Sequence, residues 1–526
     1  MSNQSSRLIQ ALQNPAIYGH SVENLSLIET HISWVILTGT YVYKIKKPVD
    51  FGFLDFSTLT KRKYYCDEEL RLNRRFAPEL YLQVVTISGD INLPQINGTG
   101  AVLEYAVKMK EFSQRDLFSH YARDRRLNAA HIDSIADAMV RFHAAAPQAD
   151  TNQTEGSSEV IIKWSAENFD HIETATPAHV LPDYFSALKA WWRKSTERLR
   201  NSMDERLAAG FVRECHGDLH LGNIAFIDGQ VTPFDCIEFN DELCWIDTTS
   251  EIAFVAMDLQ ARGYARFASR FINRYLQLSG DYAALTLLRY YIVYRALVRA
   301  KVETLAATQA SPRSHHHNNR FLSASLYLDL AKTWTSDARP ALIIMHGLSG
   351  SGKSTVAMQL AEALGAICIR SDLERKRLHN LKPVNQYGEK PNPLIYSTEA
   401  TTATYQRLLS LAGLIITAGH SAIVDATFLA GRDRRQFKQL ASQHQVEHLV
   451  ISCEADEKTL RQRIQMRNNK AQDPSDADQA VLSHQLRIQE PLSASEQMLS
   501  HTLICTETGL SRQQIHTIAR QINRPA

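Results

Sequence analysis

A glycine-rich segment near residue 350 carries the clearest chemistry in the sequence. It reads GLSGSGKS over residues 347–354 and satisfies the pattern GxxxxGK[ST] in full. Glycines at this spacing let backbone N–H groups face one concave space at a helix N-terminus, where partial positive charge favours phosphate. The Lys353 ammonium would reach the β- and γ-phosphates of ATP, and the Ser354 hydroxyl would hold Mg²⁺. The predicted nucleotide-binding residues are Gly347, Ser349, Gly350, Ser351, Gly352, Lys353, Ser354 and Thr355.

Two carboxylates and two arginines follow this segment at positions that suit phosphoryl transfer. Asp372 comes after a short apolar run and would accept the proton of a substrate hydroxyl; its alternative role is to cap the next helix. Asp425 ends the apolar run of SAIVDATF and would hold Mg²⁺ through water or contact the substrate. Arg463 and Arg467, spaced i, i+4, would clamp the transferring phosphoryl group; the alternative is a solvated basic face.

A second group of polar residues, HGDLHLGN over residues 216–223, also has the chemistry of a phosphotransferase. Asp218 would orient and deprotonate an acceptor hydroxyl, while Asn223 would turn back to hold Mg²⁺. Asp235 lies 235 − 218 = 17 residues after Asp218. Gly229 between them marks the turn of a predicted hairpin that returns the Asp235 carboxylate to the metal.

The elements that must position these residues indicate two domains. Residues 341–345 and 366–369 are apolar runs of strand length, and residues 355–364 have helical apolar spacing. A polar stretch containing Ser, Pro, His and Asn precedes a probable helix at 321–334, and a new strand follows. We predict a first domain at 1–325, a linker at 326–339 and a second domain at 340–526.

Composition excludes several classes of protein. The 526 residues contain 58 Lys plus Arg and 56 Asp plus Glu, so the formal charge is only +2. A free nucleic-acid binder usually carries a clear basic excess, and an acidic disordered regulator carries the opposite. The seven cysteines are scattered without a CxxC pair, and no signal peptide or membrane-spanning run is present. We therefore expect a cytoplasmic protein without a membrane span.

Residues 340–526 resemble the P-loop small-molecule and polynucleotide kinases, a group that includes gluconate kinase and zeta-type toxin kinases. The resemblance rests on the order of the P-loop, Asp372, Asp425 and the helix that carries Arg463 and Arg467. It implies a P-loop NTPase fold, an α/β parallel sheet flanked by helices. In that group the carboxylate after the second strand contacts the phosphate acceptor, and the arginines contact nucleotide phosphates.

The HGDLHLGN motif with Asp235 resembles the aminoglycoside phosphotransferase and choline kinase family. This implies an α+β, bilobal protein-kinase-like fold for the N-terminal domain. It also implies a lysine that pairs with the α- and β-phosphates, for which we choose Lys44, with Lys46 as the alternative. Its ion-pair partner would be Glu69, or the neighbouring Glu68. Residues 103–112 resemble the hinge strand whose backbone binds adenine.

A basic helix predicted at 290–301 could indicate the chemical class of the acceptor. In the resembled family the acceptor site is built from C-terminal helices near the catalytic loop. Arg295 and Arg299 would there favour an anionic acceptor, although salt bridges on a solvated face explain the same residues.

The whole chain resembles bacterial proteins described as bifunctional aminoglycoside phosphotransferase/ATP-binding proteins. We predict an ATP-dependent phosphotransferase with two Mg·ATP sites that acts on hydroxyl groups of small molecules. One alternative is an ATP-dependent regulator whose kinase-like domain only binds. The other is a nucleic-acid 5′-hydroxyl kinase, which the charge balance makes the weaker choice. The sequence predicts neither the acceptors nor the oligomeric state.

Overall fold

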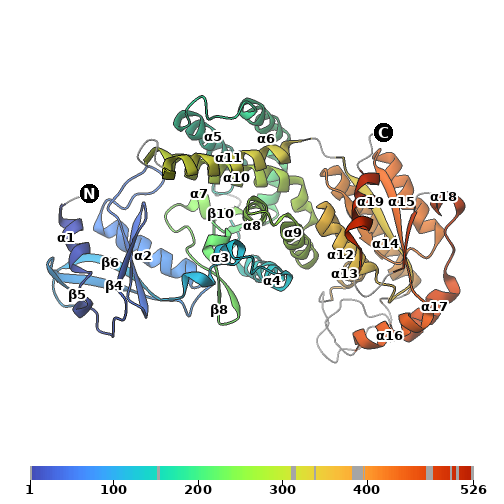
Figure 1. Ribbon diagram of the computed structural model, residues 1–526, viewed down its shortest axis with the longest axis horizontal. Coiled ribbons are helices and arrows are strands. Elements are labelled where there is room, and N and C mark those ends of the chain that lie inside the picture. Colours follow the sequence, from blue (N-terminus) through green and yellow to red (C-terminus); the bar gives the residue numbers. More distant parts are fainter. Residues whose placement is uncertain are drawn as a thin grey trace. The chain divides into compact units, whose positions relative to one another are not determined.

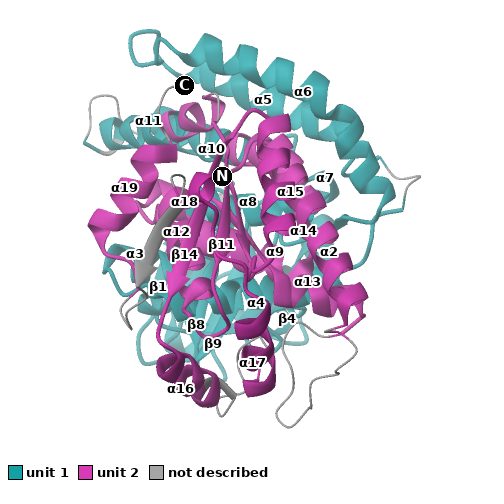
Figure 2. Ribbon diagram, turned by 90° about the vertical axis from the view of Figure 1, so that its right-hand side faces the viewer, with its two compact units in different colours: residues 1–258, 294–328 teal, residues 259–293, 329–526 magenta. Residues whose placement is uncertain are grey.

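The computed structural model describes residues 3–150, 154–309, 315–336, 339–381, 395, 397–468, 478–497, 500–504 and 509–522. They form two compact units, coloured separately in Figure 2. Unit 1 comprises Met1–Asp258 and Tyr294–Leu328, and unit 2 comprises Leu259–Val293 and Asp329–Ala526.

Unit 1 begins with an antiparallel sheet in the order β1-β2-β3-β6-β4-β5. Strand β3 places Tyr43 and Ile45 in one core cluster, whereas Val42 packs on the opposite face with residues of α2. Because side chains alternate along a strand, Lys44 shares the face of Val42. The elements are α1 (Asn3–Ala11), β1 (Ser26–Glu29), β2 (Ser33–Leu37), β3 (Tyr41–Lys46), α2 (Leu59–Asn73), β4 (Tyr81–Asp90), β5 (Leu93–Ile96) and β6 (Val102–Lys110).

The rest of unit 1 is mainly helical, with two small antiparallel sheets, β7–β10 and β8–β9. The hairpin predicted between Asn223 and Asp235 is confirmed as β8 and β9, joined at Asp228 and Gly229, both with positive φ. The elements are α3 (Phe118–Arg123), α4 (Ala129–Ala145), α5 (Ser158–Ala175), α6 (Phe185–Ala208), β7 (Val212–Glu214), β8 (Ile224–Ile227), β9 (Gln230–Pro233), α7 (Asp241–Cys244), β10 (Trp245–Asp247), α8 (Thr248–Ala261), α10 (Leu285–Gln309) and α11 (His315–Thr335). Of these, α8 and α11 end in unit 2, and α10 begins there.

Unit 2 is built on a parallel sheet in the order β12-β13-β11-β14-β15. Figure 1 shows strands of this unit with helices beside them. Parallel strands are covered on both faces, which explains why β11 is buried at every position. The elements are α9 (Ala265–Ser279), β11 (Ala341–His346), α12 (Lys353–Leu364), β12 (Ile367–Arg370), α13 (Ser371–Leu378), α14 (Thr398–Thr417), β13 (Ala422–Asp425), α15 (Gly431–Gln443), β14 (Glu447–Glu454), α16 (Glu457–Asn468), α17 (Gln479–Ile488), α18 (Ala494–Gln497), β15 (Ser500–Ile504) and α19 (Arg512–Ile522). The fold class predicted for each half is confirmed.

Helix α9 belongs to unit 2, although it lies well before the predicted second domain. It packs on α12 and β12, and Ser269 donates a hydrogen bond to the Ala361 carbonyl at 2.8 Å. The segment predicted as a linker, 326–339, is helical through Thr335 as the end of α11. The predicted domain bounds, 1–325 and 340–526, stay a prediction, while the compact units divide at other residues.

None of the described helices is long and apolar enough to cross a membrane. The cytoplasmic location stays a prediction.

Candidate functional site

The P-loop connects β11 to α12 and requires its glycines. A Cβ on Gly347 would lie 2.3 Å from the Cys453 carbonyl oxygen, and φ there is 132°. Gly352 caps α12 with a φ of 93°, which an L side chain rarely adopts. This loop therefore has the backbone conformation that the motif predicts.

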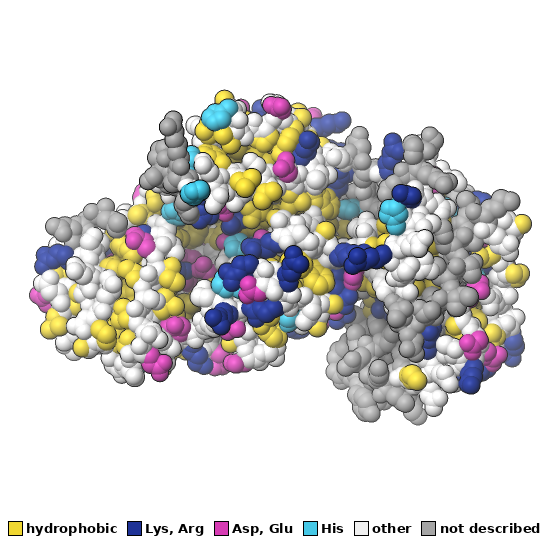
Figure 3. All heavy atoms as spheres, viewed as in Figure 1, with side chains coloured by type: hydrophobic (Ala, Val, Ile, Leu, Met, Phe, Trp, Pro, Cys, Tyr) yellow, Lys and Arg dark blue, Asp and Glu magenta, His cyan; other side chains and the backbone are white. Residues whose placement is uncertain are grey.

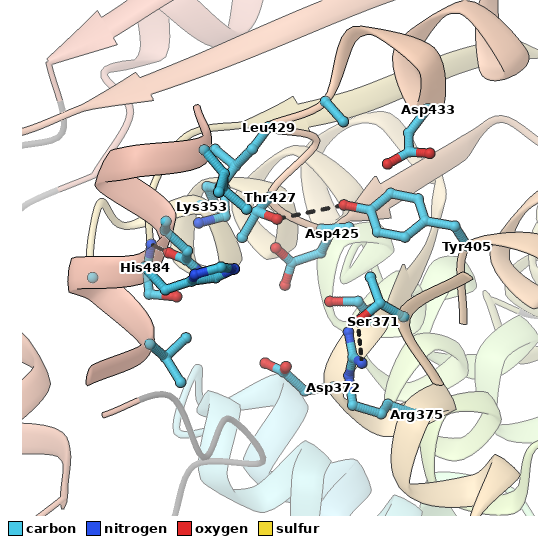
Figure 4. A pocket seen from close by; sticks show the side chains of 18 of the residues that line it. Lys353, Ser371, Asp372, Arg375, Tyr405, Asp425, Thr427, Leu429, Asp433 and His484 are labelled. Atoms are coloured by element: carbon cyan, nitrogen blue, oxygen red, sulfur yellow. Dashed lines mark hydrogen bonds between the residues drawn. The ribbon is translucent and has the colours of Figure 1, made fainter. Parts of the chain in front are cut away.

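A cavity of about 620 Å³ lies over the P-loop. It is lined by Lys353 and Ser354 from α12, Asp372 from α13, Asp425 from β13 and Arg463 from α16. Figure 4 shows Lys353, Asp372 and Asp425 pointing into this one space from separate elements. Of the other predicted nucleotide-binding residues, Ser349, Gly350, Gly352 and Thr355 also line the cavity. Gly347 and Ser351 lie behind the lining, and Ser351 is buried.

The carboxylate of Asp425 is suited to a cation. Its side chain is 5 % exposed, and Arg370 Nε lies 3.4 Å from its Oδ2. Burial raises the pKa of Asp425, although Arg370, a hydrogen bond with Ser354 and the charge of Lys353 act in the opposite direction. The Ser354–Asp425 contact brings together one hydroxyl and one carboxylate oxygen. Such hard oxygens, completed by water and nucleotide phosphates, are the ligands that Mg²⁺ prefers.

Two helices beyond the sheet complete the cavity. Leu460 and Ile464 of α16 and Leu482 of α17 form a small core with Leu348 of the P-loop as a neighbour. Gln485 Oε1 accepts a hydrogen bond from the Ser349 N–H at 2.9 Å. Arg463 Nη1 donates to the Gly350 carbonyl at 3.4 Å. Arg467 is on α16, but its side chain lies outside the described residues.

Sequence reasoning missed several residues of this cavity. Gln485 and His484 come from α17, and Tyr405 of α14 donates through its hydroxyl to Thr427 Oγ1 or accepts from it at 3.4 Å. Arg375 Nη1 donates to Thr401 Oγ1 at 3.2 Å. These residues carry no motif, because each reaches the cavity only through long-range packing.

In unit 1, a lysine–carboxylate network joins β3, α2 and the segment after β9. Lys44 Nζ lies 2.8 Å from Glu69 Oε1 and also pairs with Asp235. Lys46 Nζ lies 2.8 Å from Glu69 Oε2 and pairs with Glu238. The two candidate lysines thus share Glu69, whereas Glu68, the alternative partner, pairs with Arg71 instead. Burial works against charge on Lys44, but Asp235 and Glu69 raise its pKa well above the usual value.

The residues predicted to form the catalytic loop of unit 1 lie beside this network. Asn223 Nδ2 donates to Asp218 Oδ2 at 3.0 Å, which orients the carboxylate. Burial opposes ionisation of Asp218, but His220 and Arg299 outweigh it and lower the pKa to about 2. Asp235 has a φ of 65°, uncommon for a residue other than glycine, and its N–H donates to the Tyr81 hydroxyl at 3.0 Å. The amide oxygen of Asn223 and the carboxylate of Asp235 are again hard donors suited to Mg²⁺.

Buried Glu251 holds the loop that carries Asp218. Its Oε1 accepts hydrogen bonds from the N–H groups of His216 at 2.7 Å and Gly217 at 2.9 Å. Its Oε2 lies 2.8 Å from His143 Nε2. Because a buried carboxylate with three partners resists displacement, Glu251 fixes the backbone conformation before Asp218.

The prediction that Arg295 binds an anionic acceptor is wrong. Its side chain is 4 % exposed and donates to the Gly217 carbonyl at 3.0 Å and to Ser250 Oγ at 3.1 Å. Arg295 therefore braces, from within the protein, the loop that carries Asp218. Arg299, the other predicted residue, lies 3.3 Å from Glu303 Oε1.

Each half of the chain matches a known family of proteins. Residues 60–288 match the phosphotransferase enzyme family. This phosphotransferase region contains Glu69, Asp218, Asn223 and Asp235, and its match extends through α9 into unit 2. Residues 342–492 match an AAA domain, from β11 to just beyond α17. The predicted recognition of both halves is confirmed, and these matches support an ATP-dependent phosphotransferase.

Relatives extend along most of the chain. Uncharacterized proteins of Mycobacterium tuberculosis (strain ATCC 25618 / H37Rv) and Mycobacterium bovis are each 29 % identical over 436 residues, covering 83 % of this chain and 85 % of the relative. An alignment of this length includes most of each of the two matched regions.

Solved structures are similar to parts of the chain. An amicoumacin kinase in complex with AMP-PNP, Ca²⁺ and its ligand is 13 % identical, covering 63 % of this chain and 94 % of that one, with a TM-score of 0.40. An ethanolamine kinase of Plasmodium vivax is 11 % identical over 59 % of this chain and 84 % of that one, with a TM-score of 0.38. A gluconokinase of Sinorhizobium meliloti 1021 is 19 % identical over 35 % of this chain and 90 % of that one, with a TM-score of 0.23.

Proposed function

We propose that the protein carries two Mg·ATP sites and transfers the γ-phosphoryl group of ATP to hydroxyl groups of small molecules. The observation that carries this proposal is the P-loop cavity of unit 2. It brings a phosphate-binding lysine, two acidic side chains and an arginine from four separate elements into one space. Phosphoryl transfer requires little more from a protein than such positioning and charge stabilisation.

In unit 2, Lys353 would exchange its present hydrogen bond to the Leu348 carbonyl, 2.7 Å long, for the nucleotide phosphates. Ser354 and Asp425 would hold Mg²⁺, which neutralises charge on the β- and γ-phosphates when bound. Asp372, which lines the same cavity, would orient the acceptor hydroxyl and take its proton. Arg463 would approach the transferred group from α16.

In unit 1, Asp218 would orient the second acceptor. Its low pKa keeps the carboxylate ionised at neutral pH, and Asn223 fixes its direction. Lys44, held by Glu69, would pair with the α- and β-phosphates. Asn223 and Asp235 would provide the protein ligands of Mg²⁺. Asp235 would then exchange its ion pair with Lys44 for the metal.

We propose small molecules as acceptors because the lining of the P-loop cavity mixes basic with acidic side chains, among them Arg432 and Asp433. In the cluster of Arg432, Arg434 and Arg435, the Arg434 side chain is only 3 % exposed and pairs with Glu496. On the face shown in Figure 3, Lys and Arg side chains gather near the centre with a few Asp and Glu side chains among them, and elsewhere they are scattered. Nucleic-acid binding usually needs a continuous basic patch.

The test is a screen with γ-labelled ATP against sugars, nucleosides, aminoglycosides and 5′-hydroxyl oligonucleotides. Wild type, Asp218→Ala, Lys353→Ala and the double variant are compared. We expect one acceptor class to lose labelling with Asp218→Ala and a second to lose it with Lys353→Ala. If labelling is lost in only one of the two single variants for every acceptor, the proposal of two active sites is wrong. ATP turnover without any acceptor, lost only in Lys353→Ala, would favour a regulator.

A further inference from the structure

Unit 2 contains a second cavity, of about 540 Å³, which shares no lining residue with the P-loop cavity. One side is α15, with Arg434, Arg435 and Lys438, and the floor is β14, with His448. Residues 490–496, which follow α17, form the remaining side. All its lining residues belong to the described part of the chain.

Two cationic side chains that line this cavity have no partner among the described residues. Its carboxylates are both engaged: Glu496 lies 2.7 Å from Arg434 Nε, and Glu490 Oε2 accepts the Gly431 N–H at 2.9 Å. Within the described ranges, Arg435 and Lys438 have no hydrogen-bond or ion-pair partner, and both are exposed. With three basic and two acidic side chains, the lining carries one net positive charge.

At the floor of the cavity, the imidazole of His448 has no hydrogen-bond partner among the described residues. Both ring nitrogens of His448 are buried, and neither has a hydrogen-bond partner among the described residues. A neutral imidazole has one N–H donor and one acceptor, and leaving both unsatisfied in a protein is costly. Buried polar atoms of this kind are usually paired, and His448 is one of the residues that line the cavity, so an occupant that pairs with the ring would remove this cost.

We propose that this second cavity binds a small molecule through a phosphate group. Arg435 and Lys438 would neutralise the phosphate from α15, and the N–H of His448 would donate to one of its oxygens from below. Phosphate oxygens accept charge-assisted hydrogen bonds from such donors. The Arg434–Glu496 pair would remain intact as the wall of the site. This site is separate from the two nucleotide sites of the proposed function, so it stands or fails independently of them.

The test measures binding to the full chain by calorimetry while saturating Mg·AMP-PNP fills the nucleotide sites. The probes are inorganic phosphate and glucose 6-phosphate, with glucose as the neutral control. We expect both phosphates, and not glucose, to bind wild type. In Arg435→Gln/Lys438→Gln their affinity should fall about tenfold or more, because two charged contacts are lost. Preference for glucose 6-phosphate over inorganic phosphate would identify a phosphate ester as the ligand.

Two further variants keep the result unambiguous. Arg512→Gln/Arg520→Gln removes two exposed positive charges from α19 and should bind phosphate as wild type does. His448→Gln identifies the imidazole NMR signal that should shift when phosphate is added. Arg435 and Lys438 make no contacts that the fold needs, so their variants should keep the wild-type Tm. Equal phosphate affinity in wild type and Arg435→Gln/Lys438→Gln, or no binding to wild type, would overturn the proposal.

Discussion

Asn273 of α9 hydrogen-bonds to the backbone of β12 as a neighbouring strand would. Its Oδ1 accepts from the Cys368 N–H at 2.7 Å, and its Nδ2 donates to the Ala366 carbonyl at 2.9 Å. One residue of the phosphotransferase region thus belongs structurally to the P-loop unit. The chain on either side of β12 carries the P-loop helix and Asp372, so this contact bears on the site as well as on the fold.

Asn273→Ala should destabilise unit 2 by about 2–4 kcal/mol, because two buried backbone groups lose their partners. The measurement is urea unfolding followed by circular dichroism. Arg266→Ala, at an exposed position of the same helix, is the matched control and should unfold as wild type does. A loss below 0.5 kcal/mol, within the usual range of surface substitutions, would contradict the role given to Asn273.

Asp372→Asn should lower kcat of the reaction in unit 2 by about 10²–10⁴-fold while the KM for ATP stays unchanged. The amide keeps the shape of the carboxylate but cannot take the acceptor proton. Steady-state kinetics with the acceptor found in the screen provide the measurement, with Glu447→Gln as an exposed control. If kcat is retained, Asp372 acts only as an acidic residue in the first turn of α13, whose N-cap is Arg370.

Arg295→Lys should lower kcat of the reaction in unit 1 about tenfold or more and leave the acceptor KM unchanged. Lysine keeps the charge but cannot hold both the Gly217 carbonyl and Ser250, so the catalytic loop loses its brace. The kinetics of the Asp218-dependent reaction measure this effect. A raised acceptor KM at constant kcat would instead return Arg295 to the acceptor site.

Glu496→Gln should make the free energy of unfolding of unit 2 depend less on pH. Burial opposes ionisation of Glu496, but the hydrogen bond from Arg434 outweighs it and lowers the pKa from 4.5 to about 2. Since the folded pKa lies below the unfolded one, the carboxylate adds stability above pH 4.5 and loses it as the pH falls toward 2. Urea unfolding at pH 7, 5, 4 and 3 should show a difference between wild type and Glu496→Gln that shrinks with falling pH. A difference that stays constant to pH 3 would exclude this linkage.

Residues tied to a local pattern were the ones that the sequence could predict. The P-loop spacing determines which backbone groups face the phosphate, and the apolar runs before Asp372 and Asp425 place both at the same sheet edge. The hairpin after Asn223 could also be predicted from the sequence, because Asp228 and Gly229 favour a tight turn. Such patterns are short, and their geometry follows from the backbone alone.

Residues that act across long separations were not predictable in this way. Glu251 reaches His216 over 35 positions, and Gln485 reaches Ser349 over 136. Arg295 was misread because a buried arginine and a ligand-binding arginine have the same helical spacing. The sequence did not predict that α9 belongs to unit 2 for the same reason. Asn273 and Gln277 look like ordinary polar residues of a helix unless their contacts with β12 are known.

Side chains of α9 also cover a strand edge that could otherwise pair with another chain. Among the described strands, β12 lies at the end of its sheet, and an open strand edge is a template for pairing with another chain. Asn273 binds the Cys368 N–H, and Gln277 Nε2 donates to the Cys368 carbonyl at 3.0 Å. A P-loop domain separated from the rest at residue 340 would expose this edge and tend to aggregate, whatever its catalytic residues retained.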